Sequence, residues 1–257
     1  MFRGGFNYGE SRSLVEPSST AGTSWGLSNP IVRDPNNPDL AFSTNSPGKR
    51  VFFVATYSKS YFSWGTTSFS AFYDGHTNGS TSYVFSGDAN GDTVSGNDLI
   101  YIPRDTSEMN FRPLTVSGRS YTAAEQASAF EQLIQADKYL SSRRGQYAER
   151  GAVFLPIVNR IDLSLTQDIF TTIGGRKHGG QIRLDITNFG NMLNHDWGTG
   201  SRLVNSQILT APQADATGRL SYNLQNLSGN LITTPLQTSA GIADVYVMML
   251  SFRYTFQ

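Results

Sequence analysis

The sequence contains no cysteine and few charged side chains. Its 257 residues include 20 Lys and Arg and 20 Asp and Glu, so the formal net charge is zero. The absence of cysteine excludes a disulfide-stabilised scaffold, a zinc–thiolate cluster and a cysteine nucleophile. A net charge of zero argues against binding to the phosphate backbone of nucleic acids, and we expect no nucleic-acid partner.

Long apolar runs are also missing. No stretch approaches the ~18 consecutive apolar residues that a membrane-spanning helix needs. The first residues, Met1 to Tyr8, lack the apolar segment of a secretory signal peptide. Hydrophobic residues make up 38% of the chain, below the roughly 45–50% of an average soluble domain. Aromatic and uncharged polar residues fill the gap, which fits strands with one apolar and one wet face.

Alternation of apolar and polar residues with a period of two dominates the chain and predicts β-strands. The strongest example is the C-terminal segment, where Tyr246, Met248 and Leu250 fall on one face and Val247 and Met249 on the other. Eight candidate strands follow from this pattern: residues 2–8, 50–61, 66–74, 80–86, 159–170, 181–188, 219–227 and 246–256.

Residues 88–156 interrupt the strand pattern. Thr122 and Glu125 have the spacing of a capping box, and an apolar face then predicts a helix over residues 122–140. A connection of this length is too long to be a simple loop, so we expect a folded cap or lid.

Short turns alternate with long connections, and aromatic residues stand at several strand ends. Strands of about ten residues, tilted by ~40°, span the roughly 25 Å of an outer-membrane barrel. The predicted fold is therefore all-β: an antiparallel transmembrane β-barrel segment of about eight strands, with residues 88–156 as a long extracellular insertion. A soluble β-sandwich with one solvated face has the same alternation and is the alternative.

Several segments resemble the C-terminal barrel of TonB-dependent receptors, in particular the Oar-like subgroup. They are NP at 29–30 with NNP at 36–38, GDANGD at 87–92 with NDLIYIP at 97–103, NRIDLSLTQD at 159–168, and LDITNFGNMLN at 184–194. The terminal set Leu250, Phe252, Tyr254 and Phe256 is similar to the assembly signal of these barrels, although Gln257 leaves the last aromatic residue penultimate.

The resemblance implies that residues 1–257 are the C-terminal part of a 22-stranded barrel in the outer membrane of a Gram-negative bacterium. The chain would form pore wall and extracellular loops for substrate uptake or export. Implied partners are outer-membrane lipid, the barrel-assembly machinery, N-terminal barrel strands and a plug, with TonB engaged only through the plug region. A self-contained small outer-membrane barrel and a soluble or surface-exposed β-sandwich binding or adhesion module are the alternatives.

One segment has the spacing of a calcium loop. Asp88, Asn90 and Asp92 supply oxygens at positions one, three and five, and Asp98 offers a later one. Thr93 stands where such loops carry glycine, and no Glu occupies the twelfth position. A polar turn held by Asp and Asn side chains is the alternative. Calcium is the one cofactor that the sequence suggests.

Four charged residues sit on otherwise apolar-flanked strands: Arg160, Asp162, Arg183 and Asp185. We expect them to face a wet lumen and to pair with one another across strands, which is a structural role. The three histidines are scattered, and no Gly-x-Ser-x-Gly nucleophile motif is present. No catalytic residue, and hence no enzymatic activity, is predicted.

Overall fold

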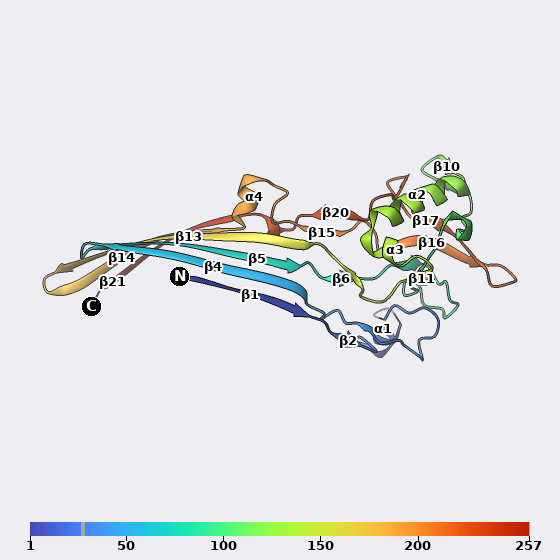
Figure 1. The fold of residues 1–257 in the computed structure, drawn as a ribbon, viewed down its shortest axis with the longest axis horizontal. Helices are drawn as coiled ribbons and strands as arrows, with labels where there is room; N and C mark the ends of the chain where they lie inside the picture. The colour runs from blue at the N-terminus through green and yellow to red at the C-terminus, as the bar shows by residue number, and fades with distance from the viewer. Residues whose placement is uncertain (27–28, 257) are drawn as a thin grey trace.

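The computed structural model describes residues 1–26 and 29–256. Its largest element is a six-stranded antiparallel sheet with the order β1–β4–β5–β13–β14–β21 (Figure 1). The strands are β1 (Phe2–Gly9), β4 (Gly48–Tyr61), β5 (Gly65–Thr77), β13 (Ile157–Ile173), β14 (Arg176–Thr187) and β21 (Val247–Phe256). The prediction of a mostly antiparallel β-structure is confirmed. The sheet is open, with β1 and β21 as its edges in the described part of the chain.

Connections of two kinds lie at opposite ends of the sheet (Figure 1). Residues 62–64 and 174–175 form short turns at one end, whereas residues 10–47, 78–156 and 188–246 form long connections at the other. Gly174 and Gly175 have φ of 61° and 76°, as a two-residue hairpin turn with two left-handed positions requires. The antiparallel order thus gathers all three long connections at one end.

Six of the eight predicted strands belong to the sheet, and two predictions are wrong as sheet strands. Residues 80–86 and 219–227 are broken into short strands within the long connections: β6 (Ser80–Thr81), β7 (Val84–Ser86), β17 (Leu220–Leu224) and β18 (Asn226–Leu227). β7 pairs in parallel with β16 (Gln207–Ala214), and β17 pairs antiparallel with it. Their alternation has another cause, because Tyr83, Phe85 and Leu224 are buried in a separate core.

The three long connections form a cap, and the latter two of them build its hydrophobic core. The largest buried side chains of this core are Tyr83, Ile100, Ile102, Phe130, Leu133, Ile134, Leu140, Ile208, Leu209 and Leu224. The first connection is tied on through backbone hydrogen bonds: Ile31 N donates to Asn97 O at 2.8 Å, and Leu99 N donates to Ile31 O at 2.7 Å. The cap therefore has the dry interior of an ordinary soluble domain.

The predicted helix over residues 122–140 is present as two helices, α2 (Ala123–Ala136) and α3 (Lys138–Ser142). Thr122 and Glu125 form the expected capping box. Asp137 separates the helices, because its carboxylate accepts hydrogen bonds from the amides of Tyr139 and Leu140 and so begins α3. Tyr83 Oη also donates to this carboxylate, at 2.6 Å.

The remaining elements are short and all belong to the long connections. They are β2 (Arg12–Ser13), α1 (Ala21–Trp25), β3 (Ala41–Phe42), β8 (Tyr101–Ile102), η1 (Thr106–Glu108), β9 (Leu114–Val116), β10 (Arg119–Tyr121), β11 (Gln146–Tyr147), β12 (Val153–Phe154), α4 (Phe189–Leu193), β15 (Gly200–Leu203), β19 (Asn230–Leu231), β20 (Leu236–Ser239) and η2 (Ile242–Asp244). Among the described residues, no helix combines the length and apolarity needed to cross a membrane.

The strand register sorts the side chains of the sheet onto two faces. Direct cross-strand neighbours form rows, one of which consists of Tyr57, Phe69, Leu165, Leu184 and Leu250. We call the face that carries this row the apolar face; its other large members are Phe2, Phe6, Val51, Phe53, Tyr73, Ile161, Leu163, Ile169, Ile182, Ile186, Met248, Phe252, Tyr254 and Phe256.

The opposite face, here the polar face, carries most of the hydroxyl and charged groups of the sheet. Its members include Arg50, Thr56, Ser58, Ser60, Thr66, Ser68, Ser70, Asp74, His76, Arg160, Asp162, Ser164, Thr166, Asp168, Gln181, Arg183, Asp185 and Arg253. A few apolar residues, among them Phe52 and Phe72, share it. One sheet thus presents two surfaces of opposite character.

Replacing Leu133 by alanine should open the cap without affecting the sheet. Leu133 is 1% exposed in the cap core, and such a truncation costs about 2–5 kcal/mol. We expect hydrogen exchange of the α2 amides to become faster, with the free energy of opening that it reports reduced by that amount. Leu193→Ala in α4, where the side chain is 61% exposed, is the matched control and should leave α2 exchange unchanged. Equal α2 protection in both variants would contradict the assigned core.

Candidate functional site

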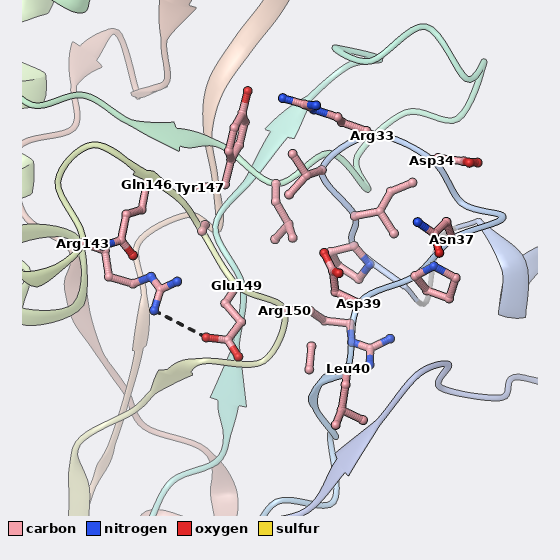
Figure 2. Close-up of a pocket in the computed structure, with 17 residues that line it drawn as sticks. Arg33, Asp34, Asn37, Asp39, Leu40, Arg143, Gln146, Tyr147, Glu149 and Arg150 are labelled. Carbon is pink, nitrogen blue, oxygen red and sulfur yellow. Dashed lines mark ion pairs between the residues drawn. The ribbon is translucent and has the colours of Figure 1, made fainter.

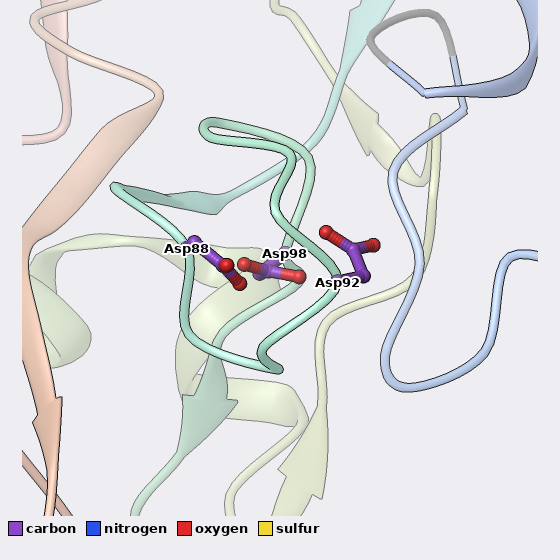
Figure 3. Close-up of side chains that lie close together, drawn as sticks. All are labelled: Asp88, Asp92 and Asp98. Carbon is purple, nitrogen blue, oxygen red and sulfur yellow. The ribbon is translucent and has the colours of Figure 1, made fainter.

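Three carboxylates meet in the loop that follows β7 (Figure 3). Oxygens of Asp88, Asp92 and Asp98 all lie within 4.8 Å of one another. The sequence placed Asp98 one residue short of the usual last ligand position, yet the structure brings it into the group. Leu99 continues from Asp98 into the buried core, so the chain bends back and the Asp98 carboxylate lies against the start of the loop, where Oδ2 accepts a hydrogen bond from Ala89 N at 2.6 Å.

Side-chain hydrogen bonds to backbone amides hold the loop in shape. Asp88 accepts from Gly91 N at 2.7 Å and from Thr93 N at 2.9 Å. Asn90 Oδ1 accepts from Asp92 N at 2.9 Å. Thr93 has a φ of 72°, the left-handed conformation that glycine adopts at the sixth position of calcium loops. The loop therefore bends at the expected position in spite of the β-branched residue.

Residues 88–98, here called the acidic loop, carry negative charge that no positive side chain offsets in the described structure. In the described part of the chain, none of the three carboxylates forms an ion pair with Lys, Arg or His. The pKa of Asp98, which is 2% exposed, is raised to about 6: burial is the main cause, the charges of Asp92 and Asp88 add to it, and the hydrogen bond from the Ala89 amide opposes it. Asp98 Oδ1 and Asn97 Oδ1 are buried and have no hydrogen-bond partner among the residues that the structure describes.

The four charged strand residues predicted as a group lie on the polar face, but they do not pair with one another across strands. Arg183 pairs with Asp185 on its own strand at 2.8 Å. Arg160 pairs with Asp244 of η2, and Asp162 accepts a hydrogen bond from Asn188 N at 2.7 Å. The predicted cross-strand pairing is wrong.

The register explains this outcome. Arg160 lies opposite Asp74, and Arg183 lies opposite Thr166 and Ser251, so no two of the four residues are direct neighbours on adjacent strands. The third long connection instead folds over the end of the polar face and supplies the partners Asp244 and Asn188.

Cross-strand polar contacts are formed by other residues of the polar face. Asp74 of β5 accepts from Arg50 Nε of β4 at 2.7 Å, and it also contacts His76 Nδ1 of its own strand at 2.8 Å. Hydroxyl pairs continue the ladder between β4 and β5: Thr56 with Ser70 at 3.2 Å, Ser58 with Ser68 at 2.7 Å and Ser60 with Thr66 at 2.9 Å. These contacts were missed in the sequence because they require the register, although the alternating Ser and Thr on both strands are their visible signal.

The four residues that resemble an assembly signal lie on the apolar face of the edge strand β21. Leu250 and Phe252 are each 74% exposed, and Tyr254 and Phe256 are also exposed. Their cross-strand neighbours on β14 include Leu184 and Ile182. A row of large apolar side chains open to the surroundings is rare on a monomeric soluble protein and marks a surface that binds something apolar.

Aromatic residues stand at both ends of the apolar face. Tyr61 and Tyr254 share a row near the short turns, and Tyr8 and Tyr73 lie toward the cap. On β5, Tyr73 is eight positions after Gly65, which is in the row of Tyr61. This spacing corresponds to ~26 Å along the strand at ~3.3 Å per residue.

The cap contains a cavity of about 630 Å³ between residues 30–41 and 143–150 (Figure 2). Side chains of both signs line it, and Arg143 pairs with Glu149 at 3.5 Å in its wall. Arg150 is buried beside it and donates to Leu14 O at 3.0 Å, a structural contact. The mixed charges do not select one class of ligand.

Comparison of the chain with protein-family models, curated proteins and solved structures found no match. Function is therefore inferred from the geometry of the chain. Each of the three histidines has a different partner: His76 contacts Asp74, His178 contacts Tyr254 and His195 contacts Asp196.

Replacing Thr93 by glycine should stabilise the cap. A residue other than glycine in the left-handed conformation costs about 1–2 kcal/mol. Glycine removes this cost, but it also raises the conformational entropy of the unfolded chain, which cancels part of the gain. We expect a net increase of up to about 1 kcal/mol in the free energy of unfolding, measured by denaturant titration. Thr115→Gly in strand β9, where φ is not positive, is the control and should destabilise. A loss of stability in Thr93→Gly would contradict the assigned strain.

Proposed function

We propose that this chain forms part of the wall of an outer-membrane β-barrel, with its apolar face toward lipid and its polar face toward a water-filled lumen. The observation that carries the proposal is the two-faced sheet. Its apolar side chains are exposed row after row, and burial of apolar surface is worth roughly 25 cal/mol per Å². A bilayer supplies that burial over the whole face at once.

The way the two faces of the sheet are covered supports a membrane location rather than a soluble β-sandwich. A soluble β-sandwich covers its apolar face with a second sheet. The other sheets in the described residues have two or three short strands, all within the long connections. The contacts of Arg160 with Asp244 and of Asp162 with Asn188 place the third connection over the polar face. This is the direction in which loops of large barrels fold into the lumen.

The open edges of the sheet point to further strands. The outer sides of β1 and β21 have no strand partner among residues 1–26 and 29–256. Inside a bilayer every backbone polar group needs a partner, which only closure of the barrel provides. We assign these partners to additional strands of a 22-stranded barrel, in keeping with the resemblance of the sequence to TonB-dependent receptors.

In this proposal the chain belongs to an Oar-like TonB-dependent transporter of a Gram-negative bacterium. The cap lies outside the cell, because long connections of outer-membrane barrels are extracellular and short turns periplasmic. The chain contributes pore wall and outer loops for substrate uptake or export, and it has no catalytic role. The barrel-assembly machinery recognises β21, the polar face adjoins a plug, and TonB acts only through that plug.

Arginine substitutions at adjacent residues of β13 test the proposal. Leu165 lies on the apolar face and Thr166 on the polar face. Leu165→Arg should destabilise the bilayer-inserted form by about 2–4 kcal/mol, the cost of Arg near the midplane, whereas Thr166→Arg should be tolerated. The measurement is urea unfolding, in lipid vesicles, of the closed barrel that contains this chain, with heat-modifiable migration on gels as the sign of a folded barrel.

Equal effects of the two arginines would contradict the orientation of the sheet. A monodisperse, folded monomer in buffer without detergent would contradict the membrane location altogether and favour the sandwich alternative.

A further inference from the structure

The acidic loop carries a formal charge of −3 on Asp88, Asp92 and Asp98, with no cationic side chain paired to it in the described structure. We infer that this loop binds a calcium ion, and that the ion fastens the first long connection to the rest of the cap. The inference does not depend on the membrane location of the sheet.

The donor set fits a hard divalent cation. Calcium takes six to eight oxygen ligands at about 2.4 Å, so oxygens on opposite sides of one ion are about 4.8 Å apart. The three carboxylates lie within 4.8 Å of one another and come from the first, fifth and eleventh positions of the loop. Asn90 at the third position holds the group together, because its Nδ2 donates to Asp92 Oδ2 at 3.2 Å and its Oδ1 accepts from Asp92 N at 2.9 Å. Calcium tolerates this irregular, carboxylate-rich set better than magnesium, which demands a near-ideal octahedron.

Two buried oxygens give independent support. Asp98 is 2% exposed and Asn97 is 0% exposed, and within residues 1–26 and 29–256 neither Oδ1 has a hydrogen-bond partner. Asn97 Nδ2 donates to Asp92 Oδ2 at 3.3 Å, so the Asn97 side chain reaches the same carboxylate group. An unpartnered buried acceptor costs free energy, and a cation bound among the three carboxylates removes that cost for Asp98.

The same loop holds the first long connection. Ile31 exchanges backbone hydrogen bonds with Asn97 and Leu99, and Asn90 Nδ2 donates to Arg33 O at 3.2 Å. The residues that contact residues 31–33 thus stand in the same loop as the three carboxylates: Asn90 lies between Asp88 and Asp92, and Asn97 and Leu99 flank Asp98. These residues also form one wall of the cavity in Figure 2. Calcium would therefore stiffen this wall of the cavity.

Calorimetric titration of the EDTA-treated full chain with calcium chloride is the first test. We expect one ion per chain and at least tenfold weaker binding in Asp98→Asn and Asp92→Asn. Asp105→Asn, an exposed carboxylate that caps η1 outside the loop, is the matched control and should bind as the wild type does. Magnesium chloride should give at least tenfold weaker binding. No calcium binding by the wild type, or wild-type affinity in both loop variants, would overturn the inference.

Hydrogen exchange tests the fastening role and guards against misfolded variants. Calcium should slow exchange of the Ile31 and Leu99 amides at least tenfold in the wild type and not in Asp92→Asn. Unchanged protection of the α2 amides in that variant would show that the cap core is intact. Calcium binding without slower exchange at Ile31 would overturn the fastening role. Failure of either test leaves the bilayer result for Leu165→Arg unaffected, so the two proposals are distinguishable.

Discussion

The apolar face of the sheet has to be kept from water, and the rest of the structure is arranged around that requirement. Antiparallel pairing puts the row of Tyr57, Leu165 and Leu250 on one surface, and no second layer covers it among the described residues. The opposite surface is satisfied locally by hydroxyl ladders and by the Arg50–Asp74 pair. A bilayer on one side and water on the other meet both demands.

The cap, in contrast to the sheet, buries its apolar side chains in a close-packed interior of its own. Phe130, Leu133 and Leu224 come from segments far apart in the sequence and share one core. A single chain thus combines a sheet whose apolar face depends on its surroundings with a cap that does not. The modest hydrophobic content of 38% suffices because each wall strand needs only every second residue to be apolar.

Features that depend on local sequence were predictable, and those that depend on the path of the chain were not. Alternation located all six sheet strands, and the capping box at Thr122 located α2, because both signals lie within a few residues. The same alternation at residues 80–86 and 219–227 was misassigned, since alternation indicates that one side of a strand is buried but does not indicate which part of the protein buries it. Arg160 finds Asp244 eighty-four residues away, a contact with no local signal. The grouping of Asp98 with Asp88 and Asp92 was indicated by their spacing within one loop.

The most direct test of the two-faced wall exploits the absence of native cysteine. Single cysteines are placed in turn at residues 160–167 of β13 in the closed barrel that contains this chain, and spin labels on them in lipid vesicles report which reagent reaches each position. The account predicts that labels at 161, 163 and 165 collide with oxygen dissolved in lipid, and that labels at 162, 164 and 166 collide with a water-soluble nickel complex. Equal access of the nickel complex to both sets would contradict it.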